Sequence, residues 1–204
     1  MQIEFNKLRP EQIYHVMTQS LVPRPIAWVL SENEQGTYNL APFSYFNSVC
    51  NNPPLVMLSI SRKPDGSPKD TRANIESRRD FVVHIAPSGM LKKLNATAAE
   101  FAAHESEVEH LQLELESFPG SRLPRLRDCH VAYSCSLYQI HELGPARQAL
   151  ILGQVHSVYV DDGICRQDDR GKLVIDAAGI DPLARLGASE YMRFGQVVEL
   201  KRPR

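Results

Sequence analysis

Short stretches of alternating or continuous hydrophobic residues run through most of this chain, a pattern typical of β-strands. Residues 26–30 and 38–40 flank the polar loop SENEQG and therefore predict a hairpin. Pro53 and Pro54 end one strand, because neither can donate a backbone hydrogen bond to a sheet, and LVMLSIS at 55–61 begins the next. Further strands are predicted at 80–86, 130–140 and 149–160, the last two as a long antiparallel pair with a break at Gly153.

Helical patterns are fewer and gather mainly in the middle of the chain. Pro10 suits the first turn of a helix over 10–19, where its missing N–H costs no hydrogen bond. Asp70 or Thr71 is expected to cap a helix that runs to residue 79, and apolar residues at three- and four-residue steps predict a second helical region over 88–115. Together these elements predict an α+β protein, mainly β, built on an antiparallel barrel with a few helices.

Composition limits the classes of function. The 204 residues fit one domain spanning 1–204, and 43% hydrophobic with 23% charged residues is ordinary globular composition. A net charge of -1 leads us to expect neither nucleic acid nor a membrane as a partner. The polar N-terminus and the lack of a long apolar run make a cytoplasmic protein the default expectation.

Cysteine and histidine spacing predicts no metal site. Cys50, Cys129, Cys135 and Cys165 show no C-x-x-C pair and are expected to be buried, reduced thiols. The seven histidines lack the spacing of metal ligands. No G-x-G-x-x-G motif opens a helix, so a nicotinamide nucleotide is expected only as a visiting substrate.

The loop SISRKPDGSPKDT is the strongest chemical signal from spacing alone. It gathers hydroxyl and cationic donors before a predicted helix, whose free amides and dipole also favour an anion. The residues concerned are Ser59, Ser61, Arg62, Lys63, Lys69 and Thr71. A phosphate monoester would fit here. The alternative is a solvated surface loop in front of a capped helix.

The segment NLAPFSYFN is unusual for a strand. Pro42 removes a ladder donor, and polar Asn39, Ser44 and Asn47 are interleaved with Phe43, Tyr45 and Phe46. Such a bend would offer hydrogen-bond donors beside aromatic surface, which is what the isoalloxazine ring of a flavin needs. The alternative is an edge strand with a proline bulge.

Taken together, these segments resemble the flavin reductase-like family. The resemblance rests on RPIAWV (24–29), NLAPFSYFN (39–47), PPLVMLSI (53–60), KDTRANI (69–75) and FVVHI (81–85), with LARLG and Tyr191-x-Arg193 near the C-terminus. Two departures are His84, where similar proteins often have asparagine, and Gln154, where they often have glutamate.

The resemblance implies the FMN-binding split β-barrel, an antiparallel, Greek-key-like fold of six barrel strands. It also implies a homodimer with FMN near the subunit interface. Carried over by position, the residues that line the isoalloxazine would be Asn39, Ser44, Tyr45, Phe46 and Asn47. Those that hold the phosphate would be Ser61, Arg62, Lys69 and Thr71.

The implied chemistry is hydride transfer from NADH or NADPH to FMN, which requires no general base from the protein. We therefore nominate no catalytic acid or base. The first hypothesis is an NAD(P)H-dependent flavin reductase, a class that includes suppliers of reduced FMN to a partner monooxygenase. Two alternatives stay open: a flavoredoxin-like electron-transfer protein with tightly bound FMN and no direct use of nicotinamide, and a protein that only stores a flavin.

Overall fold

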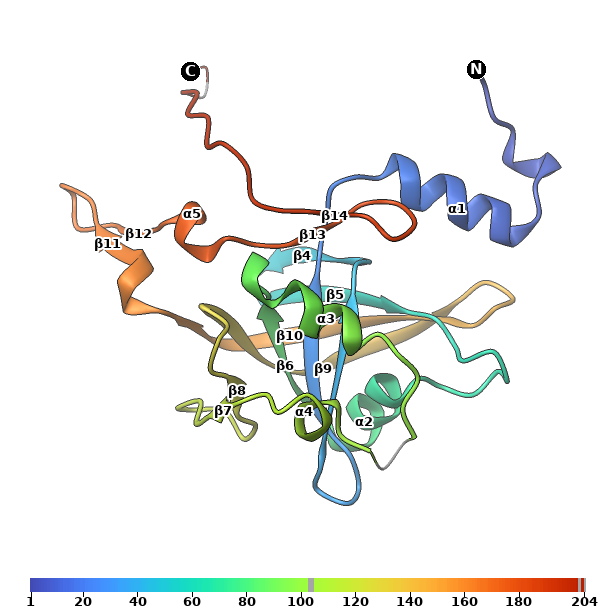
Figure 1. Ribbon diagram of the computed structural model, residues 1–204, viewed down its shortest axis with the longest axis horizontal. Coiled ribbons are helices and arrows are strands. Elements are labelled where there is room, and N and C mark those ends of the chain that lie inside the picture. Colours follow the sequence, from blue (N-terminus) through green and yellow to red (C-terminus); the bar gives the residue numbers. More distant parts are fainter. Residues whose placement is uncertain (103–104, 202, 204) are drawn as a thin grey trace.

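A computed structural model describes residues 1–102, 105–201 and 203 (Figure 1). Seven strands form one antiparallel sheet in the order β3-β2-β6-β9-β10-β5-β4. They are β2 (Ala27–Glu32), β3 (Tyr38–Phe43), β4 (Phe46–Asn51), β5 (Pro54–Ile60), β6 (Asp80–Ile85), β9 (Val131–Leu143) and β10 (Gln148–Val160). The predicted mainly β, antiparallel fold is confirmed. The sheet has one strand more than the six expected for the barrel, because β4 continues it beyond β5.

The sheet curls around a hydrophobic core, since strands that are not neighbours in the sheet, such as β2 and β5, contribute buried side chains to one cluster. This cluster joins Val29 of β2 to Leu58 of β5 and Ile151 of β10. A second cluster covers the other face, where Trp28 of β2 packs with Leu94 from the helical segment. Trp28 and Val29 point to opposite faces because side chains alternate along a strand.

The predicted hairpins are confirmed. β2 pairs with β3 from Ala27 opposite Phe43 to Glu32 opposite Tyr38. β9 pairs with β10, and their register shifts beside Gly153, at the predicted break. A Cβ on Gly153 would lie 2.4 Å from the Phe81 Cζ, so the ring of Phe81 requires glycine at this position.

The first two helices lie where the sequence predicts them, but the predicted cap is wrong. α1 covers Pro10–Ser20 and α2 covers Asp70–Arg78. Lys69 is the N-cap residue of α2, and no side chain caps this helix. The Asp70 carboxylate instead forms an ion pair with the Lys63 Nζ at 2.8 Å. The Thr71 hydroxyl accepts a hydrogen bond from the Asn39 side chain.

The long helical region predicted at 88–115 is also wrong. Only α3 (Leu91–Ala96) and α4 (Glu107–His110) are α-helical in its described part, and residues 103 and 104 lie outside the described residues. Helix α3 ends before Thr97, whose buried hydroxyl accepts a hydrogen bond from the Trp28 Nε1 at 2.8 Å and donates to the Leu94 carbonyl. The chain then runs past the edge of β3 to α4, which Ser106 caps.

The remaining elements are short and lie outside the main sheet. The paired strands are β1 (Arg24–Pro25) with β13 (Ala184–Arg185) and β14 (Tyr191–Met192), β7 (Leu115–Glu116) with β8 (Arg125–Leu126), and β11 (Cys165–Gln167) with β12 (Leu173–Ile175). The short helices are η1 (Phe5–Lys7), η2 (Ser88–Met90), η3 (Asp162–Ile164) and α5 (Ala177–Ile180). In the described part of the chain, every helix is too short or too polar to span a bilayer.

The cysteine prediction is only partly right. All four thiols are free, and Cys129 and Cys135 are buried, which raises the pKa of each. Cys165 is partly exposed. Cys50 is exposed, because it lies on β4, the strand at one edge of the sheet.

Candidate flavin site

A cavity of about 610 Å³ lies along β3, the strand at the other edge of the sheet. Its walls are β3, the loop between β5 and α2, the first turn of α2 and the segment 97–101 that follows α3. We call it the edge cavity. The predicted site residues that line it are Asn39, Ser61, Arg62, Lys69 and Thr71. The structure thus brings all four predicted phosphate-binding residues together with one predicted isoalloxazine residue.

Hydrogen bonds orient the hydroxyl end of this cavity. The Asn39 Nδ2 donates to the Thr71 Oγ1 at 2.8 Å, and both side chains are buried. Thr71 therefore accepts from Asn39 and keeps its own hydroxyl hydrogen to donate. Because these two residues come from β3 and α2, their bond fixes the helix N-terminus against the edge strand.

The cations of the loop differ in how far they are already paired. The Arg62 guanidinium donates to the Gly66 carbonyl at 2.7 Å and to Glu142 at 2.8 Å, and Lys63 binds Asp70. The Lys69 ammonium has no hydrogen-bond or ion-pair partner among the described residues. Lys69 is therefore the loop cation with most capacity to bind an anion in this cavity.

Glu107 also lines the edge cavity, and the sequence analysis missed it. Its Oε2 accepts a hydrogen bond from the Leu40 N–H at 2.9 Å, and the residue is only 5% exposed. Burial raises the pKa of Glu107, and the charge of Asp70 acts in the same direction. No local pattern distinguishes this glutamate from its acidic neighbours, because only the tertiary contact with β3 makes it special.

Apolar surface forms the other side of the edge cavity. The Leu40 N–H points away from β2 and donates to Glu107. Because backbone N–H groups alternate in direction along a strand, the nitrogen of Pro42 also lies on the side away from β2. Proline has no N–H there, so no donor is left unpaired. Phe43 and Phe101 also line the cavity. The Phe101 ring makes an edge contact with His110 of α4, at 5.2 Å between ring centroids. The cavity therefore combines apolar and aromatic surface, against which a planar ring can pack, with a loop end of mixed charge. This end carries the cations Arg62, Lys63 and Lys69 and the carboxylates of Asp65 and Asp70.

Ser44 lines a smaller cavity of about 200 Å³, which shares Pro42 and Ala98 with the edge cavity. Its hydroxyl accepts a long hydrogen bond of 3.4 Å from the Arg24 Nε. Tyr191 and Arg185 form another wall, with the Arg185 guanidinium 4.4 Å from the centroid of the Tyr191 ring. The two cavities thus adjoin at Pro42 and Ala98, and Ser44 lies in the smaller one.

Tyr45, Phe46 and Asn47 line neither of these cavities. The Tyr45 carbonyl accepts from the Ser59 N–H, and burial raises the pKa of the Tyr45 phenol. Phe46 packs against the core cluster on the inner face of the sheet, and Asn47 is exposed on β4. A role for these three residues in contacting a flavin stays a prediction.

Comparisons with known proteins define the class to which this fold and site belong. Residues 18–175 match the model of the flavin reductase like domain, and the chain belongs to this family. An uncharacterised protein of Halalkalibacterium halodurans is 32% identical over 208 residues, covering 100% of this chain and 97% of that protein.

Solved structures agree with this assignment. Nitrilotriacetate monooxygenase component B from Bacillus cereus is 32% identical, with a TM-score of 0.88 over 98% of each chain. The 2-nitrobenzoate 2-nitroreductase of Pseudomonas fluorescens is 30% identical, with a TM-score of 0.87 over 100% of this chain and 96% of that one. Flavoredoxin of Desulfovibrio vulgaris, at 19% identity and a TM-score of 0.75 over 98% and 97%, shares the fold. These results confirm the resemblance to the family and the split-barrel fold.

Proposed function

We propose that this protein binds FMN in the edge cavity and reduces it with NADH or NADPH. The observation that carries the proposal is the position of Lys69. Its unpaired ammonium lines the same cavity as the Thr71 hydroxyl and the N-terminus of α2. A phosphate monoester with about -1.5 to -2 charges suits this combination.

The rest of the cavity suits the ring system of FMN. We place the isoalloxazine along β3, against Pro42, Phe43 and Phe101, with its far edge toward Ser44 in the adjoining small cavity. A volume of about 610 Å³ lies within the usual range of about 300–1,000 Å³ for ligand sites. The residues present therefore fit both ends of the cofactor.

FMN, when bound, supplies the capacity to accept a hydride from the reduced nicotinamide. The chain supplies binding and orientation. Asn39 holds the Thr71 hydroxyl in place, Lys69 and Arg62 neutralise the phosphate, and the apolar wall excludes water from the ring. A general acid or base is not needed for this transfer, so none is assigned.

A homodimer and a monooxygenase partner belong to the same proposal. β4 leaves one edge of the sheet exposed, with Val49 53% accessible, and the C-terminal segment exposes Val197, Val198 and Leu200. An open strand edge and exposed apolar groups each favour association, and a second copy at the β4 edge would bring Tyr45 to Asn47 into an interface. The likeness to nitrilotriacetate monooxygenase component B supports a monooxygenase as the consumer of reduced FMN.

Anaerobic titration of the purified chain tests this function. With FMN present, NADH or NADPH should bleach the visible flavin absorbance at a rate that saturates with nicotinamide. FMN that binds but stays oxidised with both nucleotides would reject the reductase and leave the flavoredoxin-like electron carrier. Failure to bind FMN would reject both. Gel filtration with light scattering should give the mass of a dimer, and a monomer would reject that part of the proposal.

A further inference from the structure

Arg24 is a buried arginine behind the small cavity that contains Ser44. It is only 8% exposed, and its Nε donates to the Ser44 Oγ at 3.4 Å. Its other nitrogens donate to backbone carbonyls: Nη1 to Leu21 at 2.7 Å and to Thr18, and Nη2 to Leu186 at 2.7 Å. These partners are all neutral, so Arg24 has no carboxylate partner among the described residues.

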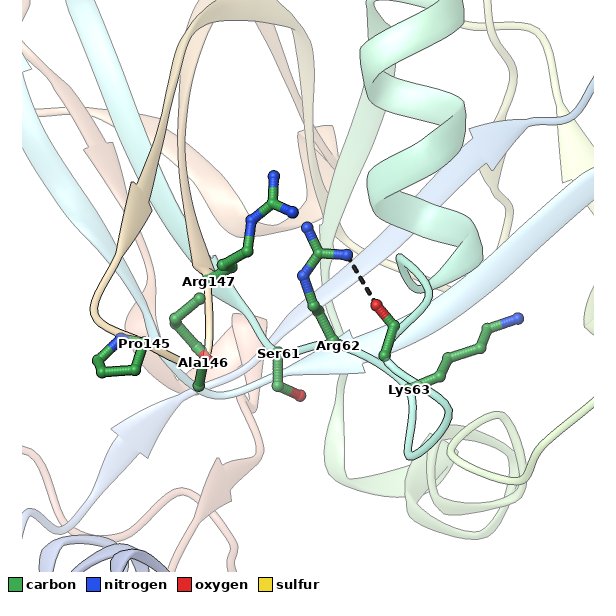
Figure 2. Close-up of a pocket in the computed structure, with 8 residues that line it drawn as sticks. Ser61, Arg62, Lys63, Pro145, Ala146 and Arg147 are labelled. Atoms are coloured by element: carbon green, nitrogen blue, oxygen red, sulfur yellow. Dashed lines mark hydrogen bonds between the residues drawn. The ribbon is translucent and has the colours of Figure 1, made fainter.

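The other buried arginines of the described chain are paired with carboxylates. Arg72 binds Glu142 at 2.6 Å, and Arg125 forms an ion pair with a glutamate of β7. Two less buried arginines are paired as well: Arg62 and Arg147 approach each other across a cavity of about 520 Å³ (Figure 2), and both bind Glu142. Burying a charge without an opposite charge costs free energy. Arg24 therefore places an uncompensated positive charge beside the small cavity.

A second guanidinium without a carboxylate partner lies on the wall of the small cavity itself. Arg185 lines this cavity, packs over the Tyr191 ring and donates to the Ala188 carbonyl. It makes no ion pair with any described residue, and the described lining of the cavity contains no carboxylate. Arg24 lies directly opposite Arg185 in the β1–β13 pair, so the two strands hold both arginines at this end of the site. The small cavity therefore favours negative charge.

Ser44 connects the buried charge to the small cavity. Its Oγ accepts from the Arg24 Nε, so its own hydrogen remains available to donate into the cavity. The isoalloxazine has a polar pyrimidine end, with carbonyl oxygens and ring nitrogens, and an apolar dimethylbenzene end. A hydroxyl donor and the Arg185 guanidinium suit the pyrimidine end.

We propose that Arg24 and Arg185 stabilise the negative charge that FMN acquires when it is reduced. In the proposed reaction the nicotinamide C4–H bond breaks, and the hydride forms a new N5–H bond on the flavin. The nicotinamide is oxidised, and the flavin takes up both electrons and becomes an anion with its charge spread over N1 and the C2 oxygen. Ser44 and Arg185 contact this end of the ring, and Arg24 is a positioning residue that acts through the Ser44 hydroxyl. This proposal rests on the binding of FMN in the proposed function.

The midpoint potential of bound FMN tests the proposal, because it reports how much more tightly the protein binds reduced than oxidised FMN. Dithionite and reference dyes make the measurement independent of nicotinamide. Arg24→Gln and Arg185→Gln should each weaken reduced FMN by about tenfold relative to oxidised FMN, which lowers the potential by about 30 mV for a two-electron couple. Unit charges about 12 Å apart have an effect of this size at an effective dielectric constant of about 20. Arg185→Lys keeps the charge and should keep the affinity ratio within about twofold of the wild type.

Ser44→Ala is the second variant for the Arg24 side of the cavity, because Arg24→Gln also removes the bonds from this arginine to α1 and to the loop after β13. Ser44→Ala leaves those bonds in place and should lower the potential in the same direction. Arg127→Gln is the matched control. Arg127 is 52% exposed, binds Glu114 and Glu116 and lines neither cavity, so this variant should leave the potential unchanged.

An unchanged potential in Arg185→Gln or in Ser44→Ala would overturn the proposal. A loss in Arg185→Lys as large as that in Arg185→Gln would also overturn it, since the shape of the side chain and not its charge would then matter. Equal weakening of oxidised and reduced FMN would overturn it too, because the arginines would then serve only to form the cavity. Failure of the wild-type chain to bind FMN would instead reject the proposed function itself.

Discussion

Lys69→Ala is the most informative single substitution for the edge cavity. Its ammonium has no partner among the described residues, so removing it breaks no existing ion pair. The side chain makes no capping hydrogen bond to α2 either, and the backbone of residue 69 can keep its extended conformation. The variant should therefore fold like the wild type and differ only in what it binds.

The size of the effect follows from the interaction that is lost. One charge-assisted hydrogen bond to a phosphate is worth about 1–3 kcal/mol, or roughly 5- to 150-fold in Kd. Riboflavin has no phosphate, so its affinity should change little. The difference between the two ligands isolates the phosphate contact from any general effect on the cavity.

Equilibrium titration by flavin fluorescence measures both affinities, and thermal unfolding checks the fold. Lys172→Ala, at an exposed lysine in the turn between β11 and β12, is the control and should bind both ligands normally. Equal FMN affinity in Lys69→Ala and the wild type would refute the assignment of the phosphate to this loop. A parallel loss of riboflavin affinity would mean that Lys69 supports the cavity instead of binding the phosphate.

Three further variants test other parts of the account. Burial lowers the pKa of His84 from 6.5 to about 4. Above pH 6.5 the ring is neutral in both the folded and the unfolded chain. As the pH falls from 6.5 to 4, the unfolded chain binds a proton that the folded chain does not, so the free energy of unfolding falls by about 3 kcal/mol. Chemical unfolding at several pH values should show this slope in the wild type and lose it in His84→Asn. Gly153→Ala should destabilise the fold by about 1–3 kcal/mol, because its methyl group would overlap the Phe81 ring, and an unchanged unfolding midpoint would contradict that packing. Glu107→Gln should tighten FMN binding at high pH, because it removes a buried negative charge from the cavity. The glutamine oxygen can still accept the hydrogen bond from the Leu40 N–H. Weaker FMN binding in this variant would contradict the prediction.

Most of the sheet could be predicted from the sequence, because its strands are defined by local patterns. Alternation located β9 and β10, the polar loop after residue 30 located the β2–β3 hairpin, and Pro10 marked the start of α1. The loop 61–71 was also recognisable, since its donors are close together in the chain and α2 follows directly.

The errors arose where tertiary contacts override local preference. Apolar spacing favours a helix beyond Ala96, but α3 ends there, and the Trp28 indole holds the hydroxyl of the next residue, Thr97, in the core. Phe101 and Glu107 both line the cavity beside β3, a position that no local pattern predicts. His84 is a similar case: its ring bridges the Trp28 carbonyl and the Leu126 N–H inside the core, so its departure from the common asparagine is explained by packing.

A crystal structure of the chain with FMN tests the central claim most directly. The account predicts the phosphate within hydrogen-bond distance of the Lys69 Nζ and the Thr71 Oγ1, and the isoalloxazine along β3 beside Pro42 and Phe101. FMN bound elsewhere, or bound in the edge cavity with its phosphate away from the loop 61–71, would contradict it.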